Sequence, residues 1–236
     1  MELVRGLHNL RPRHRGCAAT IGNFDGVHLG HQSVLGQLAQ RAAELQVPVT
    51  VVLFEPQPRE YFAPQSAPPR LTRFREKVEA LRRFGVDRIV CLRFDQRLAG
   101  MTPEDFIRRI LLDGLGVKYL VVGDDFRFGK DRVGTFSMLQ QAGDAHGFPV
   151  VNMHTFGIEG SRVSSTRIRE ALAAGDLATA EALLGRQFRL SGRVAHGDKR
   201  GRQIGFPTAN IHPVSYTHLT LPTTCNLCRS RWSPDL

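Results

Sequence analysis

The sequence is poor in cysteine and has no long apolar stretch. Cys17 and Cys91 lie in apolar runs, and Cys225 and Cys228 form one C-x-x-C near the end. A single pair of this kind, without a second ligand pair, indicates neither a disulfide framework nor a zinc or redox site. No apolar run approaches the length of a membrane span, and the basic N-terminal segment lacks the apolar core of a signal peptide. We therefore expect a cytoplasmic protein with no membrane partner.

Two common phosphate-binding motifs are also missing. The sequence contains no G-x-x-x-x-G-K-[ST], and no G-x-G-x-x-G opens a helix, so neither a P-loop nor a dinucleotide-binding fold is supported. The chain is nevertheless basic, with 32 Lys and Arg against 22 Asp and Glu. This excess predicts an anionic partner. The arginines are scattered and few aromatics lie among them, which argues against nucleic acid as that partner.

Apolar β-branched runs alternate with segments of helical periodicity over the first 184 residues. Strands are predicted at residues 17–21, 47–54, 86–94, 117–123 and 148–155. The first predicted helix follows the glycine- and histidine-rich residues 22–31 and ends at about residue 46. Further helices are predicted at residues 74–84, 103–114, about 130–147, 163–175 and 176–184. This alternation predicts an α/β fold with a doubly wound, Rossmann-like parallel sheet. Residues 185–213 change character and resemble the start of a β-rich domain.

The first strand is followed by a segment rich in glycine and histidine, residues 22–31, which leads directly into a helix. His28 and His31 are three residues apart, so they lie on the same side of that helix near its N-terminus. Unpaired backbone N–H groups and the helix dipole favour an anion at this point, and glycines allow a phosphate to approach the backbone. The segment therefore predicts a phosphate site at the carboxyl edge of the sheet.

Four further segments accompany this one in a fixed order: residues 54–60 together with 70–72, residues 122–129, residues 163–169 and residues 205–210. Residues 22–31, which contain His28 and His31, look like an H-x-G-H nucleotidyltransferase motif. Gly205-Phe206-Pro207-Thr208-Ala209-Asn210 resembles a P-T-A-N signature. Together they resemble the prokaryotic bifunctional riboflavin kinase/FMN adenylyltransferase family, also called FAD synthetase. The resemblance covers about residues 1–213.

The resemblance implies that residues 1–184 form a nucleotidyltransferase that moves AMP from ATP to FMN, giving FAD and pyrophosphate with Mg²⁺. It implies a catalytic role for His28, His31 and Arg169, which would stabilise charge on the phosphates. The residues implied in ATP binding are Gly22, Asn23, Phe24, Asp25, Gly30, Ser164, Ser165 and Thr166. The residues implied in FMN binding are Pro56, Pro58, Arg59, Asp125, Phe126, Arg127 and Phe128. Of the neighbours Asp124 and Asp125, we expect Asp125 to face the site, because adjacent residues on an extended segment point oppositely.

Residues 185–213 resemble the beginning of a riboflavin kinase β-barrel. In that domain the resemblance assigns Mg²⁺–ATP to Lys199, Gly201, Thr208 and Asn210. The family's barrel continues through a glutamate that would be the base for the riboflavin hydroxyl, so we expect no conversion of riboflavin to FMN. Residues 214–236 show no family character, and we expect them to be a sequencing or assembly artefact.

Two other functions stay open at this point. One is a nucleotidyltransferase with a different phosphate acceptor, such as phosphopantetheine. The other is a basic nucleic-acid-binding protein, whose affinity would fall steeply with salt. The sequence leaves the oligomeric state open.

Overall fold

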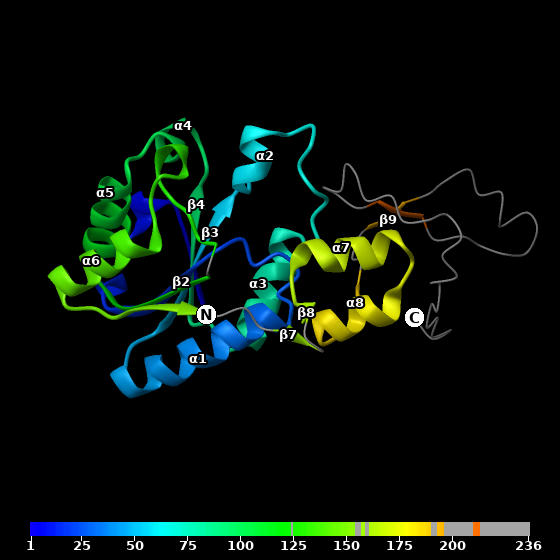
Figure 1. Cartoon of the computed structure of the whole chain (residues 1–236), viewed down its shortest axis with the longest axis horizontal. Helices are drawn as coiled ribbons and strands as arrows, with labels where there is room; N and C mark the ends of the chain where they lie inside the picture. The colour runs from blue at the N-terminus through cyan, green and yellow to red at the C-terminus, as the bar shows by residue number, and fades with distance from the viewer. Residues whose placement is uncertain (124, 154–156, 159–160, 190–192, 196–209, 213–236) are drawn as a thin grey trace, which may run out of the picture.

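The computed structural model describes residues 1–123, 125–153, 157–158, 161–189, 193–195 and 210–212. Its centre is a six-stranded sheet in the order β1-β4-β3-β2-β5-β6, in which every neighbouring pair is parallel (Figure 1). The strands are β1 (Glu2–Arg5), β2 (Cys17–Ile21), β3 (Val49–Glu55), β4 (Arg88–Arg93), β5 (Val117–Gly123) and β6 (Val150–Met153). This sheet confirms the predicted α/β fold.

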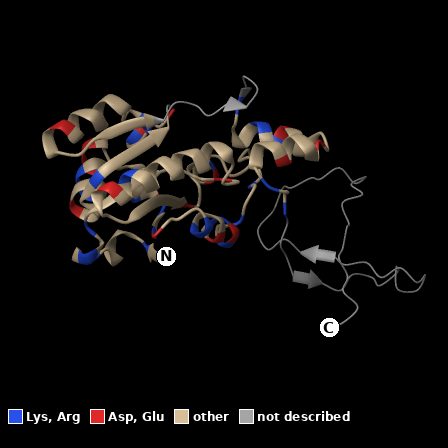
Figure 2. Ribbon diagram, turned by 90° about the horizontal axis from the view of Figure 1, so that it is seen from below, with Lys and Arg blue, Asp and Glu red and all other residues tan. Residues whose placement is uncertain are grey.

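Helices cover both faces of the sheet because the strands are apolar on both sides. One core contains α1 (Leu29–Leu45) and α3 (Phe74–Arg83). The opposite core contains α4 (Gln96–Ala99), α5 (Pro103–Phe106), the π-helix η3 (Ile107–Leu115) and α6 (Phe136–His146). The helices α7 (Ser165–Ala173) and α8 (Leu177–Leu184) lie beside the sheet (Figure 1), and their apolar side chains form a third cluster. Figure 2 shows basic and acidic positions interspersed along the described helices.

The remaining described elements are short. They are the helix α2 (Pro58–Phe62), the 3₁₀ turns η1 (Leu7–Asn9), η2 (Pro12–His14) and η4 (Lys130–Arg132), and two antiparallel pairs. The strands of these pairs are β7 (Gly157–Ile158) with β8 (Ser161–Arg162), and β9 (Arg193–Ala195) with β10 (Asn210–His212). Of the expected barrel at residues 185–213, residues 190–192, 196–209 and 213 lie outside the described residues. No helix in the described part of the chain is both long and apolar enough to cross a membrane.

The sheet changes direction of winding at β2. Its neighbours are β3, which follows it along the chain, and β5, which is added on the other side. In doubly wound folds, ligands bind at this switch, outside the carboxyl ends of the strands. The segment between β2 and α1, which holds the predicted phosphate site, begins at that edge.

All five predicted strands are present with small shifts at their ends, but β1 was missed. It is a four-residue edge strand in which only Val4 is buried, so it carries little apolar signal. The short helices α2 and α4 were also missed, and the helix predicted at 103–114 changes to π geometry from Ile107. Thr102 caps α5, accepting from the Asp105 N–H.

The packing of α1 against the sheet provides a test of this core. Leu38 is fully buried, whereas Leu45, the last residue of the same helix, is 46% exposed. Leu38→Ala should therefore lower the free energy of unfolding by about 2–5 kcal/mol, since it leaves a cavity, whereas Leu45→Ala should cost under about 1 kcal/mol. Urea denaturation of both variants measures the difference, and equal losses would contradict this packing.

Candidate active site

A cleft of about 460 Å³ lies at the carboxyl edge of the sheet. Its walls come from the ends of β2, β3 and β5 and from the N-terminal turns of α1 and α7. The lining residues are 20–25, 28, 30, 31, 34, 54, 57–59, 68, 123, 125–127, 132, 162–166 and 169. Its size lies within the usual range for sites that bind small molecules, about 300–1,000 Å³.

The two histidines stack on each other in this cleft. His28 caps α1, and its Nδ1 accepts a hydrogen bond from the backbone N–H of His31 at 3.4 Å. The two rings lie 3.6 Å apart, centroid to centroid, at an angle of 18°. Because Nδ1 of His28 accepts, the neutral ring carries its proton on Nε2, which leaves a donor for a ligand. Nδ1 of His31 is buried and has no hydrogen-bond partner among the described residues.

Gly30 explains the spacing between the histidines. A Cβ at this position would lie 3.2 Å from Nδ1 and 3.3 Å from Cε1 of His28. The carbonyl oxygen of Val163 lies only 3.5 Å from the same point. We expected the glycines of this segment to make room for a phosphate. At Gly30 the space is instead taken by the His28 ring, so the glycine allows that ring to fold over the first turn of α1.

Both histidines are neutral in the free protein at pH 7. Burial, followed by the nearby Arg186, Arg162 and Arg169, lowers the pKa of His28 to about 4, although Asp25 opposes this shift. Burial also holds the pKa of His31 well below its ordinary value, with further contributions from His28, Lys77 and Arg186. The pair therefore offers the cleft N–H donors without a buried positive charge.

Asp25 joins three segments that are distant in the sequence. Its carboxylate is 3% exposed and accepts from the backbone N–H groups of Leu71 and Thr72 at 3.0–3.1 Å and from the Thr72 hydroxyl at 3.2 Å. Arg169 donates to it at 2.5 Å and also to the carbonyl of Pro69 at 2.6 Å. These oxygens are therefore occupied by the protein. Asp25 and Arg169 both line the cleft. We call this ion pair, with the amides that bind Asp25, the Asp25 brace, because it holds three segments of the cleft together.

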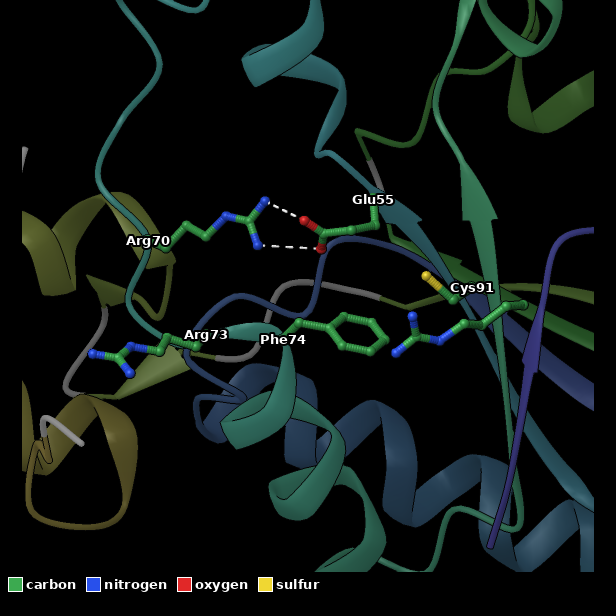
Figure 3. A pocket seen from close by; sticks show the side chains of 6 residues that line it. Glu55, Arg70, Arg73, Phe74 and Cys91 are labelled. Carbon is green, nitrogen blue, oxygen red and sulfur yellow. Dashed lines mark hydrogen bonds and ion pairs between the residues drawn. The ribbon is translucent and has the colours of Figure 1, made fainter. Parts of the chain in front are cut away.

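A second cluster of ion pairs, around Arg70, holds the segment that binds Asp25. Arg70 donates to both carboxylate oxygens of Glu55, at 3.1 and 2.5 Å, and to both of Glu60, each at 2.5 Å. Figure 3 shows Arg70 pointing toward Glu55 beside a smaller cavity of about 200 Å³. Because Arg70 directly precedes Leu71, the cluster fixes the amides that bind Asp25. This arrangement indicates a structural role for the smaller cavity's polar wall.

The start of α7 forms the wall opposite the histidines. The Ser164 hydroxyl caps this helix by accepting from the Arg167 N–H at 3.2 Å. The Ser165 hydroxyl donates to the backbone carbonyl of Asp25 at 2.9 Å. Thr166 also lines the cleft. The expected phosphate-binding segment therefore lies at the cleft, where a helix N-terminus favours an anion.

Five of the seven residues predicted to bind FMN line the cleft: Pro58, Arg59, Asp125, Phe126 and Arg127. Asp125 faces it as expected and forms an ion pair with Arg162 at 3.5 Å. Asp124 lies outside the described residues.

Pro56 and Phe128 do not line the cleft, so this arrangement does not support their predicted contacts with the flavin. Phe128 is 5% exposed, and its ring lies 5.1 Å from that of Phe106 in the core. Its backbone pairs with Gly134, and its ring covers the space where a side chain at that glycine would lie. Pro56 is followed by Gln57, which lines the cleft in its place.

Four basic residues in or near the site were not predicted from the sequence. Arg132 and Arg162 line the cleft, and the adjacent 163–169 motif was the available signal for Arg162. Lys77 is 2% exposed, and burial lowers its pKa although Asp25, Glu55 and Glu60 oppose this. Arg186 binds the loop before His28. No motif marked Lys77 or Arg186. The predicted kinase residues Lys199, Gly201 and Thr208 lie outside the described residues, and Asn210 is described only as a backbone position in β10.

The switch-point cleft and the histidine pair at a helix N-terminus define an α/β fold of the nucleotidyltransferase type. Residues 10–167 match the FAD synthetase family and residues 184–225 match the riboflavin kinase family. The chain belongs to the bifunctional riboflavin kinase/FMN adenylyltransferase family, with the FAD synthetase domain present and the kinase domain partial. The kinase match continues past residue 213, where we expected the family resemblance to end, and the predicted domain boundaries stay predictions.

Relatives with that name align with most of this chain. The protein from Pseudomonas fluorescens is 60% identical over 211 residues, which cover 89% of this chain and 68% of the relative. The protein from Escherichia coli K12 is 53% identical over 212 residues, with the same two coverages. Among solved structures, a macrolide-efflux protein from Streptococcus pneumoniae is 28% identical, with a TM-score of 0.78, covering 93% of this chain and 71% of that one. These relatives do not favour either alternative function.

The lowered pKa of His28 predicts a pH-dependent stability. Its pKa is about 4 in the folded chain and 6.5 when unperturbed, so the unfolded chain takes up a proton first as the pH falls. Stability should then decrease between pH 6.5 and 4, by up to roughly 3 kcal/mol from this residue. Urea denaturation at pH 7 and 4.5 should show a smaller change for His28→Gln than for wild type. The exposed His146→Gln should behave like wild type, and a His28 that titrates near pH 6.5 by NMR would contradict the prediction.

The Asp25 brace predicts a large loss of stability on neutralisation. Asp25→Asn leaves the half-buried guanidinium of Arg169 without its partner charge and the amides around Asp25 without a carboxylate, and it should lower the free energy of unfolding by about 3–5 kcal/mol. Asp105→Asn makes the same change in an exposed pair with Arg108 and should cost far less, because solvent screens that pair. Denaturant titration measures the free energy of unfolding of both variants. Similar losses in the two would show that Asp25 does not hold the cleft segments together.

Proposed function

We propose that this chain transfers AMP from ATP to FMN and so forms FAD and pyrophosphate. The observation that carries the proposal is the stacked pair of neutral histidines at the N-terminus of α1, facing a cleft lined by Arg169 and by four further arginines that are not paired with Asp25. These arginines are Arg59, Arg127, Arg132 and Arg162. The family name of the relatives supplies the substrates. The net charge of +10 also suits two substrates that are both polyanions.

The chemistry requires little from the protein except positioning. An oxygen of the FMN phosphate attacks the α-phosphorus of ATP, the new P–O bond forms, and the bond to the β-phosphate oxygen breaks. A phosphomonoester with a second pKa of about 6 is already largely ionised at pH 7, so no general base is needed. Most of the rate must then come from orientation and from stabilising charge on the phosphates.

The histidines suit the phosphate that reacts. We assign the Nε2–H of His28 and the first backbone amides of α1 to the α-phosphate and the leaving pyrophosphate. His31 would donate beside it from the same face. Neutral rings can do this before ATP binds, and the negative charge of ATP would raise the pKa of both rings and strengthen these hydrogen bonds.

The other walls suit the remaining parts of the two substrates. The N-terminal turn of α7, with Ser164 and Thr166, would hold the β- and γ-phosphates of ATP. Pro58 and Phe126 would pack against the flavin ring, and Arg59 or Arg127 would bind the FMN phosphate. Gly22 and Asn23, which follow β2 along the floor of the cleft, would lie against the nucleotide.

The described residues do not form a Mg²⁺ site of their own. The oxygens of Asp25 are occupied, Asp125 pairs with Arg162, and no group of three or more metal-ligating side chains occurs in the described ranges. Mg²⁺ in such enzymes is usually held by substrate phosphates and water. We therefore treat Mg²⁺ as part of the substrate Mg²⁺–ATP. Riboflavin as a substrate belongs to the partial kinase domain, and the cytoplasmic location and the lack of nucleic-acid or membrane partners stay predictions.

A single assay tests the proposal. The purified chain, given Mg²⁺–ATP and FMN, should release pyrophosphate and form equal amounts of FAD, whereas phosphopantetheine in place of FMN should give neither. His28→Ala should lower kcat by about 10²–10³-fold, the usual cost of one donor to a developing oxyanion. His146→Ala, at an exposed position at the end of α6, is the matched control and should keep wild-type activity. The absence of FMN-dependent pyrophosphate release would overturn the assignment.

A further inference from the structure

The turn that leads into His28 has an unfavourable backbone conformation. Gly26 and Val27 both have positive φ angles, 83° and 40°. Glycine adopts such angles freely, but a β-branched residue such as Val27 rarely does. A conformation of this kind persists only when surrounding contacts hold it. Because Val27 directly precedes His28, those contacts also decide where the catalytic ring points.

Side chains hold three consecutive carbonyl groups of this turn. The hydroxyl of Ser165 donates to the Asp25 carbonyl at 2.9 Å. Arg186 donates to the Gly26 carbonyl at 2.5 Å and to the Val27 carbonyl at 3.0 Å. Gln32 donates to the Val27 carbonyl as well, at 2.9 Å.

Arg186 and Gln32 also tie the turn to the end of α8. Both donate to the carbonyl of Leu184, at 3.2 and 2.9 Å respectively. The guanidinium thus bridges carbonyls from two segments that lie about 160 residues apart in the sequence. Its planar fork of donors fits this task, whereas a lysine presents a single point charge.

Arg186 contacts the loop and does not line the cleft. It also lies beyond residues 10–167, which match the FAD synthetase family, and within residues 184–225, which match riboflavin kinase. The segment where the second domain begins therefore supports the site of the first.

We propose that Arg186 is a positioning residue for adenylyl transfer: by holding the Gly26–Val27 turn, it sets His28 and His31 against the α-phosphate of ATP. The inference rests on the proposed function of the cleft. It adds that the adenylyltransferase site needs a residue from the start of the kinase segment.

Two substitutions in the full chain separate the contacts of Arg186 from its charge. Arg186→Lys keeps the charge and loses the fork, and Arg186→Met loses both. Both should lower kcat with Mg²⁺–ATP and FMN by about 10- to 100-fold, with KM for ATP changed less than about threefold, since misplacing a catalytic group acts on the reacting geometry. Arg189→Met, at an exposed position three residues further on, is the matched control and should keep wild-type kcat.

The titration of His28 gives a readout that general destabilisation would not produce. Arg186 lowers the pKa of His28, so Arg186→Met should raise it, whereas Arg186→Lys should leave it near 4 while kcat still falls. Gln32→Leu removes one donor to Val27 without changing charge and should give a smaller loss of kcat. Added guanidinium should partly restore the kcat of Arg186→Ala.

Hydrogen exchange keeps the inference testable apart from activity. The His31 amide, bonded to His28, should exchange faster in both Arg186 variants than in wild type or Arg189→Met. Wild-type kcat and wild-type exchange in both Arg186 variants would overturn the inference. If wild type itself releases no pyrophosphate with FMN, the proposed function fails, and the exchange rates still decide whether Arg186 positions the histidines.

Discussion

The ion pair between the buried Asp25 and the half-buried Arg169 is the interaction on which the cleft depends. Parallel strands bring their ends to one edge, but only side chains join the loops that follow. Asp25 connects the loop after β2 to the backbone of residues 71–72 and, through Arg169, to α7. A buried carboxylate is costly unless donors satisfy it, and here four different donors do so. The donors come from residues 71–72 and from α7, so the contacts that satisfy the Asp25 charge also bring these segments together at the cleft.

This brace also sets the electrostatics around the histidines. The cleft contains several arginines, so protonated histidines would add positive charge to an already positive and partly buried region. Burial keeps both rings neutral until a polyanion enters, with help from Arg186, Arg162 and Arg169 at His28 and from His28, Lys77 and Arg186 at His31. The free protein therefore avoids the desolvation cost of two buried cations, and the pair becomes more strongly donating when phosphate charge is present. Such a site binds a phosphate ligand through fixed contacts and also through histidine N–H groups that donate more strongly once the ligand's negative charge is present.

Local patterns predicted the main sheet and most of the cleft lining, because each of the five predicted strands has a dense apolar run and most of the lining residues lie in motif segments. Local patterns did not predict the features that depend on contacts between residues distant in the sequence. The edge strand β1 buries only Val4, and Phe128 turns into the core because Gly134 opposite it leaves room for its ring. Asp25 was expected to touch the nucleotide, but the amides of Leu71 and Thr72, over 40 residues away, occupy its carboxylate. Lys77 and Arg186 have no local signal, since what gives each a role is the group of carboxylates or carbonyls that folding brings to it.

The packing of the third apolar cluster bears on where the adenylyltransferase unit ends. This cluster joins Leu71 and Val163 to Leu183 and Leu184 of α8, so α8 packs against the segment that supplies amides to Asp25. Arg186 then extends the same contact to the turn before His28. A boundary at residue 167, where the match to the FAD synthetase family ends, would cut α7 and remove α8. Apolar burial and hydrogen bonding both favour a unit that includes Arg186. Arg186, which lies within the match to the riboflavin kinase family, is therefore bound to the turn before His28.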